Sequence, residues 1–532
     1  MTEIARFKAG RIHVARAGLA TQARLCVDML QQGRGMAWVV KNRDELLTAR
    51  ALMRLFSPEL SSGDFLPDAF DKGGWTSLPP FSPRSANREG WTERLAALYA
   101  LRSGQAKGLI LTADNLLPKL VPLDFFENRE VTLIRGEDVS LDMILEQAVE
   151  WGYERVSMVS NPGEIARRGD ILDIMPPGYD KPIRLDFFGD LIEEIRLFDP
   201  VSQRSKANLS EVRVLPVSPI RQSPADQAKM QARWKSLFQK NMLTENERFG
   251  LTRLQEQGDF RLLPGCCYDT ATNLEAWLPA DTVWVLPGLS DLRDMLSSAE
   301  RLWTEAFEAQ DVEGRPQPQR LAMREASDVE SACERFACVH AEPLVMGIAK
   351  GIHDLPERSL SSFEELFPST AEQDRPWQTL VQALKRWQND KRQTILCFAS
   401  EKSRTKFLNL ASQDGLSPLL RYSGEQHGLF ALVAPFRVGA ELIWDESLIL
   451  GEDLLQPHAE KSRRVPTGAF KGLDRYDELK PGDLLVHRDY GIARFGGLLR
   501  METGSTANDF LLLHYSGDDR LYVPVDRLSL IQ

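Results

Sequence analysis

The segment that begins at Gly18 is the best-placed candidate for a nucleotide site. It follows a strand-like run, 12–14, and precedes a helical pattern. A phosphate-binding loop needs glycines whose backbone N–H groups surround the phosphate, a lysine for charge, and a Ser or Thr for Mg²⁺. Ala23, Arg24 and Leu25 stand where Gly, Lys and Ser or Thr are required. Leu25 cannot ligate Mg²⁺, so we predict a degenerate nucleotide site that does not hydrolyse ATP.

No other group of side chains has the spacing of a catalytic or metal site. The seven histidines are dispersed, and neither G-x-S-x-G nor H-E-x-x-H occurs. Asp445 and Glu446 follow a strand-like run and are interpreted as a solvated strand end. Cys333, Cys338 and His340 fit no common zinc pattern. We therefore predict no catalytic residue, no bound metal and no cofactor, and we expect the cysteines to be buried, reduced thiols.

A predicted β-hairpin over residues 183–198 carries a second kind of site. Side chains alternate between the two faces of a strand, so the apolar residues at 183, 185 and 187 form a core face. Arg184, Asp186 and Phe188 share the other face. An exposed Phe beside an Arg is typical of a protein-binding hot spot, and the arginines at 167 and 168 are expected to extend it. The alternative is that a helix covers this face and makes Phe188 part of the core.

The composition is that of a globular protein with several domains. Of the 532 residues, 43% are apolar and 27% charged, and the length predicts about three to five domains. The 65 basic and 76 acidic residues give a net charge of −11, which disfavours a protein that wraps nucleic acid. Residues 1–10 lack the apolar core of a signal peptide, and no apolar run approaches transmembrane length. We expect a cytoplasmic monomer without membrane contact.

Alternating strand-like and helical runs predict a multi-domain α/β architecture. Strands at 36–40 and 108–112, with helices at 21–30 and 91–102, predict a mostly parallel sheet. Three strand-like runs between 171 and 198 predict a small antiparallel insert, with a two-residue turn at Gly189-Asp190. Helical patterns return after Pro216. Beyond a break near residue 350, strands at 394–399, 430–433 and 441–444 predict a further α/β domain.

The last part of the chain has a different composition. Residues 453–472 are polar, contain proline and glycine, and are interpreted as a linker. From Gly482 onward, short strands rich in β-branched, aromatic and glycine residues predict a small closed barrel. Residues 473–532 hold ten acidic and seven basic side chains, so DNA phosphate is not the expected target. Such a barrel can bind a partner through an edge strand; a spacer is the alternative.

Three ordered stretches resemble the UvrB-homology module, which the excision-repair protein UvrB shares with the transcription-repair coupling factors. They are Gly163–Pro176 (GEIARRGDILDIMP), Ile183–Asp190 (IRLDFFGD) and Ile195–Pro200 (IRLFDP). UvrB has a working phosphate loop and an aromatic hairpin that inserts into DNA. Here the site at Gly18 is degenerate, and Phe81–Ala86 (FSPRSA) stands where that hairpin is expected. The resemblance therefore favours the coupling factors over UvrB.

A second resemblance lies at the end of the chain. Gly482–Phe495 (GDLLVHRDYGIARF), Asp509–Tyr515 (DFLLLHY) and Leu521–Val525 (LYVPV) are similar to the RNA polymerase-interacting domain of the same family, a relative of CarD-type modules. Both resemblances in this order indicate the transcription-repair coupling factor (Mfd) family. That family continues into an ATP-driven DNA translocase. The sequence stops at Gln532, so we expect ATP and Mg²⁺ to serve only motor domains that this chain lacks.

The resemblance implies two sets of partner-binding residues. In the family, the insert binds UvrA through residues that align with Arg168, Arg184 and Phe188. The polymerase-interacting domain binds the β subunit of RNA polymerase, and we expect its edge strand to make the contact. The residues expected there are Ile492, Arg494, Leu499 and Met501.

Pattern and resemblance together divide the chain into six parts. We expect a UvrB-like domain 1a of degenerate P-loop type (1–130), the UvrA-binding insert (131–214), a UvrB-like domain 1b (215–350), an α/β domain of unknown role (351–452), a linker (453–472) and a CarD/Tudor-like polymerase-interacting barrel (473–532).

The function implied by the resemblance is that of an adaptor in transcription-coupled nucleotide excision repair. The chain would bind stalled RNA polymerase and recruit UvrA, and damaged DNA would be reached through the full-length protein. One alternative is a CarD-like regulator that binds polymerase only, and failure to bind UvrA would favour it. The other is a divergent UvrB-type excision-nuclease subunit, which ATPase activity of this chain would favour.

Overall fold

The computed structural model describes residues 10–56, 74–200, 202–342, 352–369, 374–422, 427–434, 436, 439–455, 482–487, 491–503, 506–515 and 520–524. The chain forms two compact units, Met1–Pro457 and His458–Gln532. The predicted linker and the break near residue 350 fall largely on residues outside the described ranges.

The first unit is built on a seven-stranded sheet in the order β15-β1-β14-β13-β2-β4-β3. Every neighbouring pair is parallel, which confirms the predicted parallel α/β architecture. Its strands are β1 (Arg11–Ala15), β2 (Met36–Val40), β3 (Trp75–Leu78), β4 (Gly108–Thr112), β13 (Val283–Pro287), β14 (Ala337–Glu342) and β15 (Ile352–Asp354).

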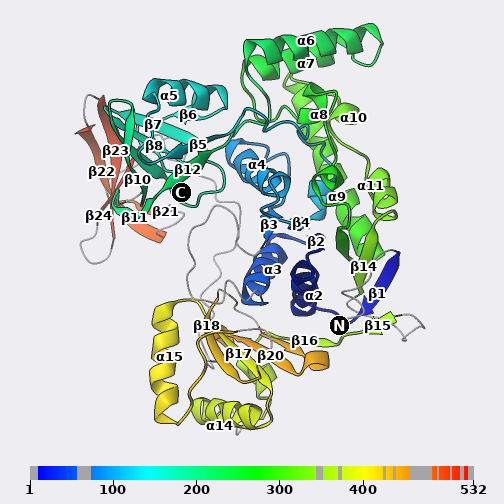
Figure 1. Cartoon of the computed structure of the whole chain (residues 1–532), viewed down its shortest axis with the longest axis vertical. Coiled ribbons are helices and arrows are strands. Elements are labelled where there is room, and N and C mark those ends of the chain that lie inside the picture. The colour runs from blue at the N-terminus through cyan, green and yellow to red at the C-terminus, as the bar shows by residue number, and fades with distance from the viewer. Residues whose placement is uncertain are drawn as a thin grey trace. The chain divides into compact units, whose positions relative to one another are not determined.

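Helices cover both faces of this sheet because its central strands are apolar on both sides. All five residues of β2 are buried, and successive side chains belong to two different cores. One core includes α4 (Arg88–Arg102) and α9 (Leu289–Val312). The other includes α2 (Leu19–Gln31) and α3 (Arg43–Phe56), which lie between this sheet and a second, five-stranded sheet (Figure 1).

A helical layer follows between residues 224 and 333. Ser223 caps its first helix, and a Thr244–Glu247 capping box starts the second. Besides α9, its helices are α6 (Pro224–Gln239), α7 (Glu245–Glu256), α8 (Pro264–Cys267), α10 (Gln319–Ala322) and α11 (Ala326–Cys333).

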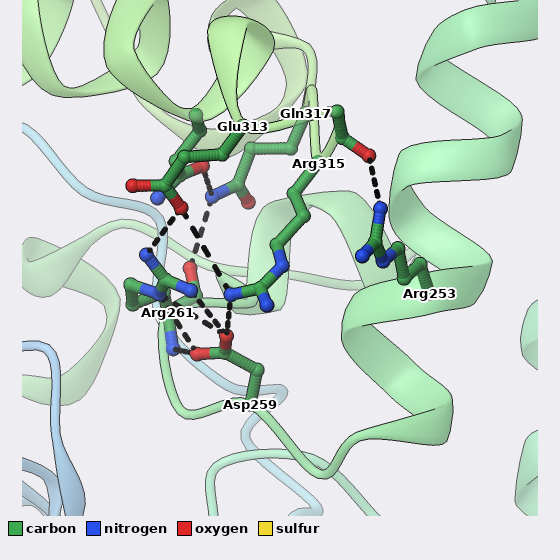
Figure 2. Close-up of polar contacts among 8 residues, drawn as sticks. Arg253, Asp259, Arg261, Glu313, Arg315 and Gln317 are labelled. Atoms are coloured by element: carbon green, nitrogen blue, oxygen red, sulfur yellow. Dashed lines mark hydrogen bonds and ion pairs between the residues drawn. The ribbon is translucent and has the colours of Figure 1, made fainter.

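A polar network fastens the segment after α7 to the segment after α9 (Figure 2). Arg261 donates to Asp259 at 2.7 Å and to Glu313 at 3.2 Å, and Arg315 lies 3.7 Å from Asp259. Burial raises the pKa of Asp259, but the hydrogen bonds from Arg261 outweigh burial, so this pKa lies below its ordinary value. Each carboxylate of this network is paired with an arginine of the same network, so we interpret the network as structural.

The insert holds a six-stranded sheet in the order β11-β10-β9-β8-β7-β6, larger than the three strands predicted. Helix α5 (Leu141–Glu150) packs against one face, and β5 (Val131–Ile134) pairs with β12 (Glu211–Val214). The strands of the sheet are β6 (Glu154–Arg155), β7 (Glu164–Arg168), β8 (Ile171–Ile174), β9 (Ile183–Phe188), β10 (Leu191–Phe198) and β11 (Ser205–Leu209).

A mixed five-stranded sheet, in the order β16-β19-β20-β17-β18, completes the first unit. One of its strands, predicted at 441–444, lies two residues earlier: β19 ends at Leu442, because residues 443–445 form a 3-10 turn and Glu446 has a left-handed backbone. Its elements are β16 (Glu357–Leu360), α12 (Phe363–Leu366), α14 (Pro376–Asn389), β17 (Gln393–Phe398), α15 (Glu401–Gln413), β18 (Leu429–Val433), β19 (Gly439–Leu442) and β20 (Ser447–Gly451).

The second unit contains a four-stranded antiparallel sheet in sequence order. Among its described residues the first and last strands do not pair with each other, so the predicted closed barrel is not confirmed. The strands are β21 (Leu484–His487), β22 (Gly491–Thr503), β23 (Thr506–His514) and β24 (Arg520–Pro524). All six cysteines of the chain lie in the first unit, free and buried as predicted.

Candidate protein-binding surfaces

The alternation predicted for the hairpin is present in β9. Its residues at 183, 185 and 187 are buried in the core under α5. Phe188 is 73% exposed, so the interpretation in which a helix covers this side chain is wrong. Gly189 makes the turn with a positive φ of 65°, a conformation that glycine adopts without steric cost.

The sheet register places Arg168, Arg184 and Phe188 on one face. Arg168 of β7 lies opposite Ile171 of β8, and Ile171 lies opposite Asp186 of β9. Directly paired residues on neighbouring strands point to the same side of a sheet. Because Arg184 and Phe188 share the face of Asp186, all three predicted side chains belong to what we call the insert outer face.

Arg184 is held in place by neighbours on this face. Its guanidinium donates to both carboxylate oxygens of Asp173, at 2.7 and 2.8 Å, and to Gln203 at 3.1 Å. It also lies over the ring of Phe198, 4.5 Å from the centroid. The hydrogen bonds to Asp173 raise the pKa of Arg184. With side-chain exposures of 17% for Arg184 and 2% for Asp173, this is a fixed guanidinium and not a mobile surface arginine.

The two adjacent arginines of β7 lie on opposite faces. Arg168 is exposed and donates to the Ser157 carbonyl at 2.6 Å. Arg167 pairs with Asp142 of α5 and lies opposite Leu172, a core residue. The prediction that Arg167 extends the outer face is therefore wrong.

Two further charged residues lie on the insert outer face, and neither was among the predicted site residues. Arg196 of β10 pairs directly opposite Arg184, and its guanidinium forms an ion pair with Asp186. Glu194 lies 3.4 Å from the same guanidinium. Their positions along β10 could have indicated that they share a face with Arg184, but only if the pairing of β10 with β9 had been known.

The second candidate surface is the outer face of the four-stranded sheet. Ile492 and Arg494 lie opposite residues 486 and 484 of β21, and Leu499 lies opposite Phe510 of β23. A shift of register between Phe495 and Gly497 inserts one extra residue. This bulge reverses the alternation, so an even-numbered pair, 492 and 494, shares one face with the odd-numbered pair, 499 and 501.

Apolar side chains are exposed on this sheet outer face. Ile492 is 68% exposed, and Leu484, Val486, Leu499 and Tyr522 are also exposed. Arg494 is exposed beside them. The backbone of Met501 lies in β22, but its side chain lies outside the described residues. Exposed apolar side chains gathered on one face are typical of a surface that binds another protein.

The prediction that 492–501 is an edge strand is wrong only at the middle of the segment. Residues 491–494 of β22 pair with β21, and the pairing with β23 runs from Arg494 to Thr503, so Arg494 has a partner strand on both sides. Phe495 is tied to Asp483 through its backbone N–H at 2.8 Å. Within the described residues, 491–493 have no partner on the β23 side and 496–503 have none on the β21 side, so edge pairing is closed only at residues 494 and 495.

The residues of the predicted degenerate nucleotide site lie together at the start of α2. Gly18 precedes the helix, and Ala23 and Leu25 are fully buried. Arg24 donates to the Tyr422 hydroxyl at 3.0 Å. Among the described residues, no three His, Cys, Asp or Glu side chains are placed to hold a metal ion, and no helix is long and apolar enough to cross a membrane.

Comparison with known proteins identifies two domains in this chain. Residues 131–219 match the family model of the UvrB interaction domain, and residues 479–532 match the CarD-like/TRCF RID domain. The transcription-repair-coupling factor of Myxococcus xanthus is 29% identical over 494 residues, covering 85% of this chain and 40% of the relative. Those of Escherichia coli K12 and Haemophilus influenzae are each 27% identical, covering 86% and 91% of the chain. The chain thus spans about two fifths of the length of these relatives.

Proposed function

We propose that this chain, which matches the amino-terminal part of the transcription-repair-coupling factors, is the adaptor portion of such a factor in transcription-coupled nucleotide excision repair. The observation that carries the proposal is the presence on one chain of a UvrB interaction domain and a CarD-like/TRCF RID domain. Each of the two has an outer face with an exposed apolar side chain. One chain would then hold a repair protein and a polymerase at the same time.

The insert outer face would bind UvrA. Phe188 offers an aromatic anchor at the tip of the hairpin, and aromatic and arginine side chains dominate binding energy in protein interfaces. Arg184 is already fixed by Asp173, so little side-chain entropy would be lost when a partner binds beside it. Arg168 would supply a second, exposed guanidinium.

The sheet outer face would bind RNA polymerase, and we propose its β subunit as the contact. Ile492 and Leu499 would supply apolar area, with Arg494 beside them and Met501 further along β22. The unpaired side of 496–503 leaves backbone groups that a partner strand can use. The six-part division of the chain given above belongs to the same proposal, as does a monomeric, cytoplasmic state.

We further propose that this chain does not itself hydrolyse nucleotide. Leu25 stands at the Mg²⁺-ligand position and is buried. ATP and Mg²⁺ would serve motor domains elsewhere in the complete protein, through which contact with damaged DNA would also be made.

The test is a bridging experiment with purified proteins. Core RNA polymerase is immobilised, and UvrA is added with and without this chain. We expect UvrA to be retained only when the chain is present, and Phe188→Ala to weaken UvrA binding by about 2 kcal/mol, roughly thirtyfold. Phe249→Ala is the matched control, because Phe249 is an exposed phenylalanine of α7, remote in sequence from the insert. Polymerase binding without UvrA retention would favour the CarD-like regulator instead.

A further inference from the structure

The loop before α2 is closed by a residue from far along the chain. Gly18 has no side chain with which to cap α2, and the first backbone N–H groups of that helix need acceptors. Glu357, the first residue of β16, supplies them. Its carboxylate accepts hydrogen bonds from the Thr21 N–H at 2.8 Å and from the Ala20 N–H at 3.3 Å. A phosphate would bind at the same place in a working nucleotide loop, where the helix N-terminus favours an anion.

The space around Gly18 fits this carboxylate closely. A Cβ added at Gly18 would lie 2.4 Å from Cδ and Oε1 of Glu357, and 2.8 Å from Oε2. The backbone φ of −75° is open to any residue, so glycine is required here by the carboxylate and not by the backbone.

The backbone on both sides of this contact is also joined. The Leu355 N–H donates to the Ala15 carbonyl at 3.1 Å, and the Glu357 N–H donates to the Arg16 carbonyl at 3.0 Å. Arg16 itself bonds to Asp354 through Nε at 2.9 Å. The end of β1 and the loop after it are thus hydrogen-bonded to the segment between β15 and β16.

Residues next to the strands of the five-stranded sheet make further contacts with the same helix. The Trp444 indole N–H donates to the Thr21 hydroxyl at 3.0 Å. Arg24, which stands where a phosphate-binding lysine would be, donates to Tyr422 at 3.0 Å. Apolar residues of the two sheets share one core around α2. Gly18 and Arg24 of the predicted degenerate nucleotide site thus both contact the 352–455 region.

We propose that the N-terminus of α2 is an anion site which the chain fills with its own Glu357 carboxylate, so that the 352–455 region is held there as an internal ligand. The site accepts the carboxylate and phosphate class of anion. It is closed to external anions while Glu357 occupies it. This gives a role to the α/β region after residue 351 and does not depend on which partners the chain binds.

The first test removes the internal ligand and supplies an external one. Glu357→Ala deletes a carboxylate and one methylene, which acetate matches in size, and inorganic phosphate is the second probe. We expect the variant to melt several degrees below the parent, and acetate or phosphate to raise its melting temperature. The melting temperature of the parent should rise no more with acetate or phosphate than with chloride at equal ionic strength. If neither anion stabilises the variant more than the parent, the proposal is wrong.

The second test asks whether Gly18 and Glu357 act as one unit. Gly18→Ala should lower the melting temperature of the parent, because the new Cβ displaces the carboxylate. In the Glu357→Ala background the same change meets no carboxylate and should cost little. Strong non-additivity supports the internal ligand. Equal losses in both backgrounds would show that Gly18 is needed for another reason and would overturn the proposal.

Discussion

The insert outer face and the sheet outer face are built by the same strand alternation, but they present opposite chemistry. On the insert, charged side chains are tied to one another: Arg184 to Asp173 and Arg196 to Asp186. Phe188 stands exposed at one end. On the C-terminal sheet, aliphatic side chains such as Ile492 are themselves exposed. Alternation, reversed at the bulge in β22, thus decides which side chains face outward, while cross-strand partners decide whether they are free to bind.

This difference predicts two modes of recognition. A face of fixed charges gives specificity and steering of a charged partner, and one aromatic anchor adds affinity. A face of exposed aliphatic side chains gains affinity mainly by burying apolar area. We therefore expect substitutions of the paired charges on the insert to affect its folding as well as binding, and substitutions on the C-terminal sheet to affect binding alone.

The largest expected effect is that of Arg184→Ala on stability. Asp173 has a side-chain exposure of only 2%, so the variant leaves a buried carboxylate without its cation, which costs about 3 kcal/mol. Chemical denaturation, followed by a probe in the insert, measures the loss. Arg168→Ala is the matched control, because Arg168 is exposed and donates to a single carbonyl, and it should cost less than about 1 kcal/mol. Equal losses in the two variants would remove the distinction between a fixed and a free arginine.

The next effect is on polymerase binding by the C-terminal sheet. Ile492→Asp places a charge on an exposed apolar position and should weaken binding by about 1 to 2 kcal/mol, roughly tenfold. The fold should be unaffected because the side chain is 68% exposed. Leu302→Asp provides the control, since Leu302 is an exposed aliphatic residue of α9 in the other unit. Unchanged affinity of the Ile492 variant would move the polymerase contact away from this face.

The parts of these surfaces that sequence predicted are those set by local pattern. The alternation in β9 follows from its period-two pattern, which places Phe188 on the face opposite the core, although the pattern left open whether a helix covers that face. The parallel sheet follows from apolar runs such as Met36–Val40, whose residues are all buried. Each of these features depends on residues within a few positions of one another.

What the sequence missed depends on pairing between distant residues. Asp173 meets Arg184 only because β8 pairs with β9 in one register. The bulge in β22 keeps Arg494 and Leu499 on one face, and a strict count of two along the strand would separate them. The approach of Glu357 to Thr21 spans more than three hundred residues. No local pattern encodes any of these contacts, since each is decided by how whole elements pack.

The smallest expected effect is a difference in salt dependence between the two partners. Raising ionic strength from about 0.1 M to about 0.5 M shortens the Debye length and weakens interactions between solvent-exposed charges. UvrA binding through Arg168 and its neighbours should therefore weaken by a few-fold, whereas polymerase binding through Ile492 and Leu499 should change less, because burial of apolar area is not screened. Calorimetry at both salt concentrations measures the two slopes. A steeper slope for polymerase would mean that Arg494, and not the aliphatic side chains, carries the contact on the sheet outer face.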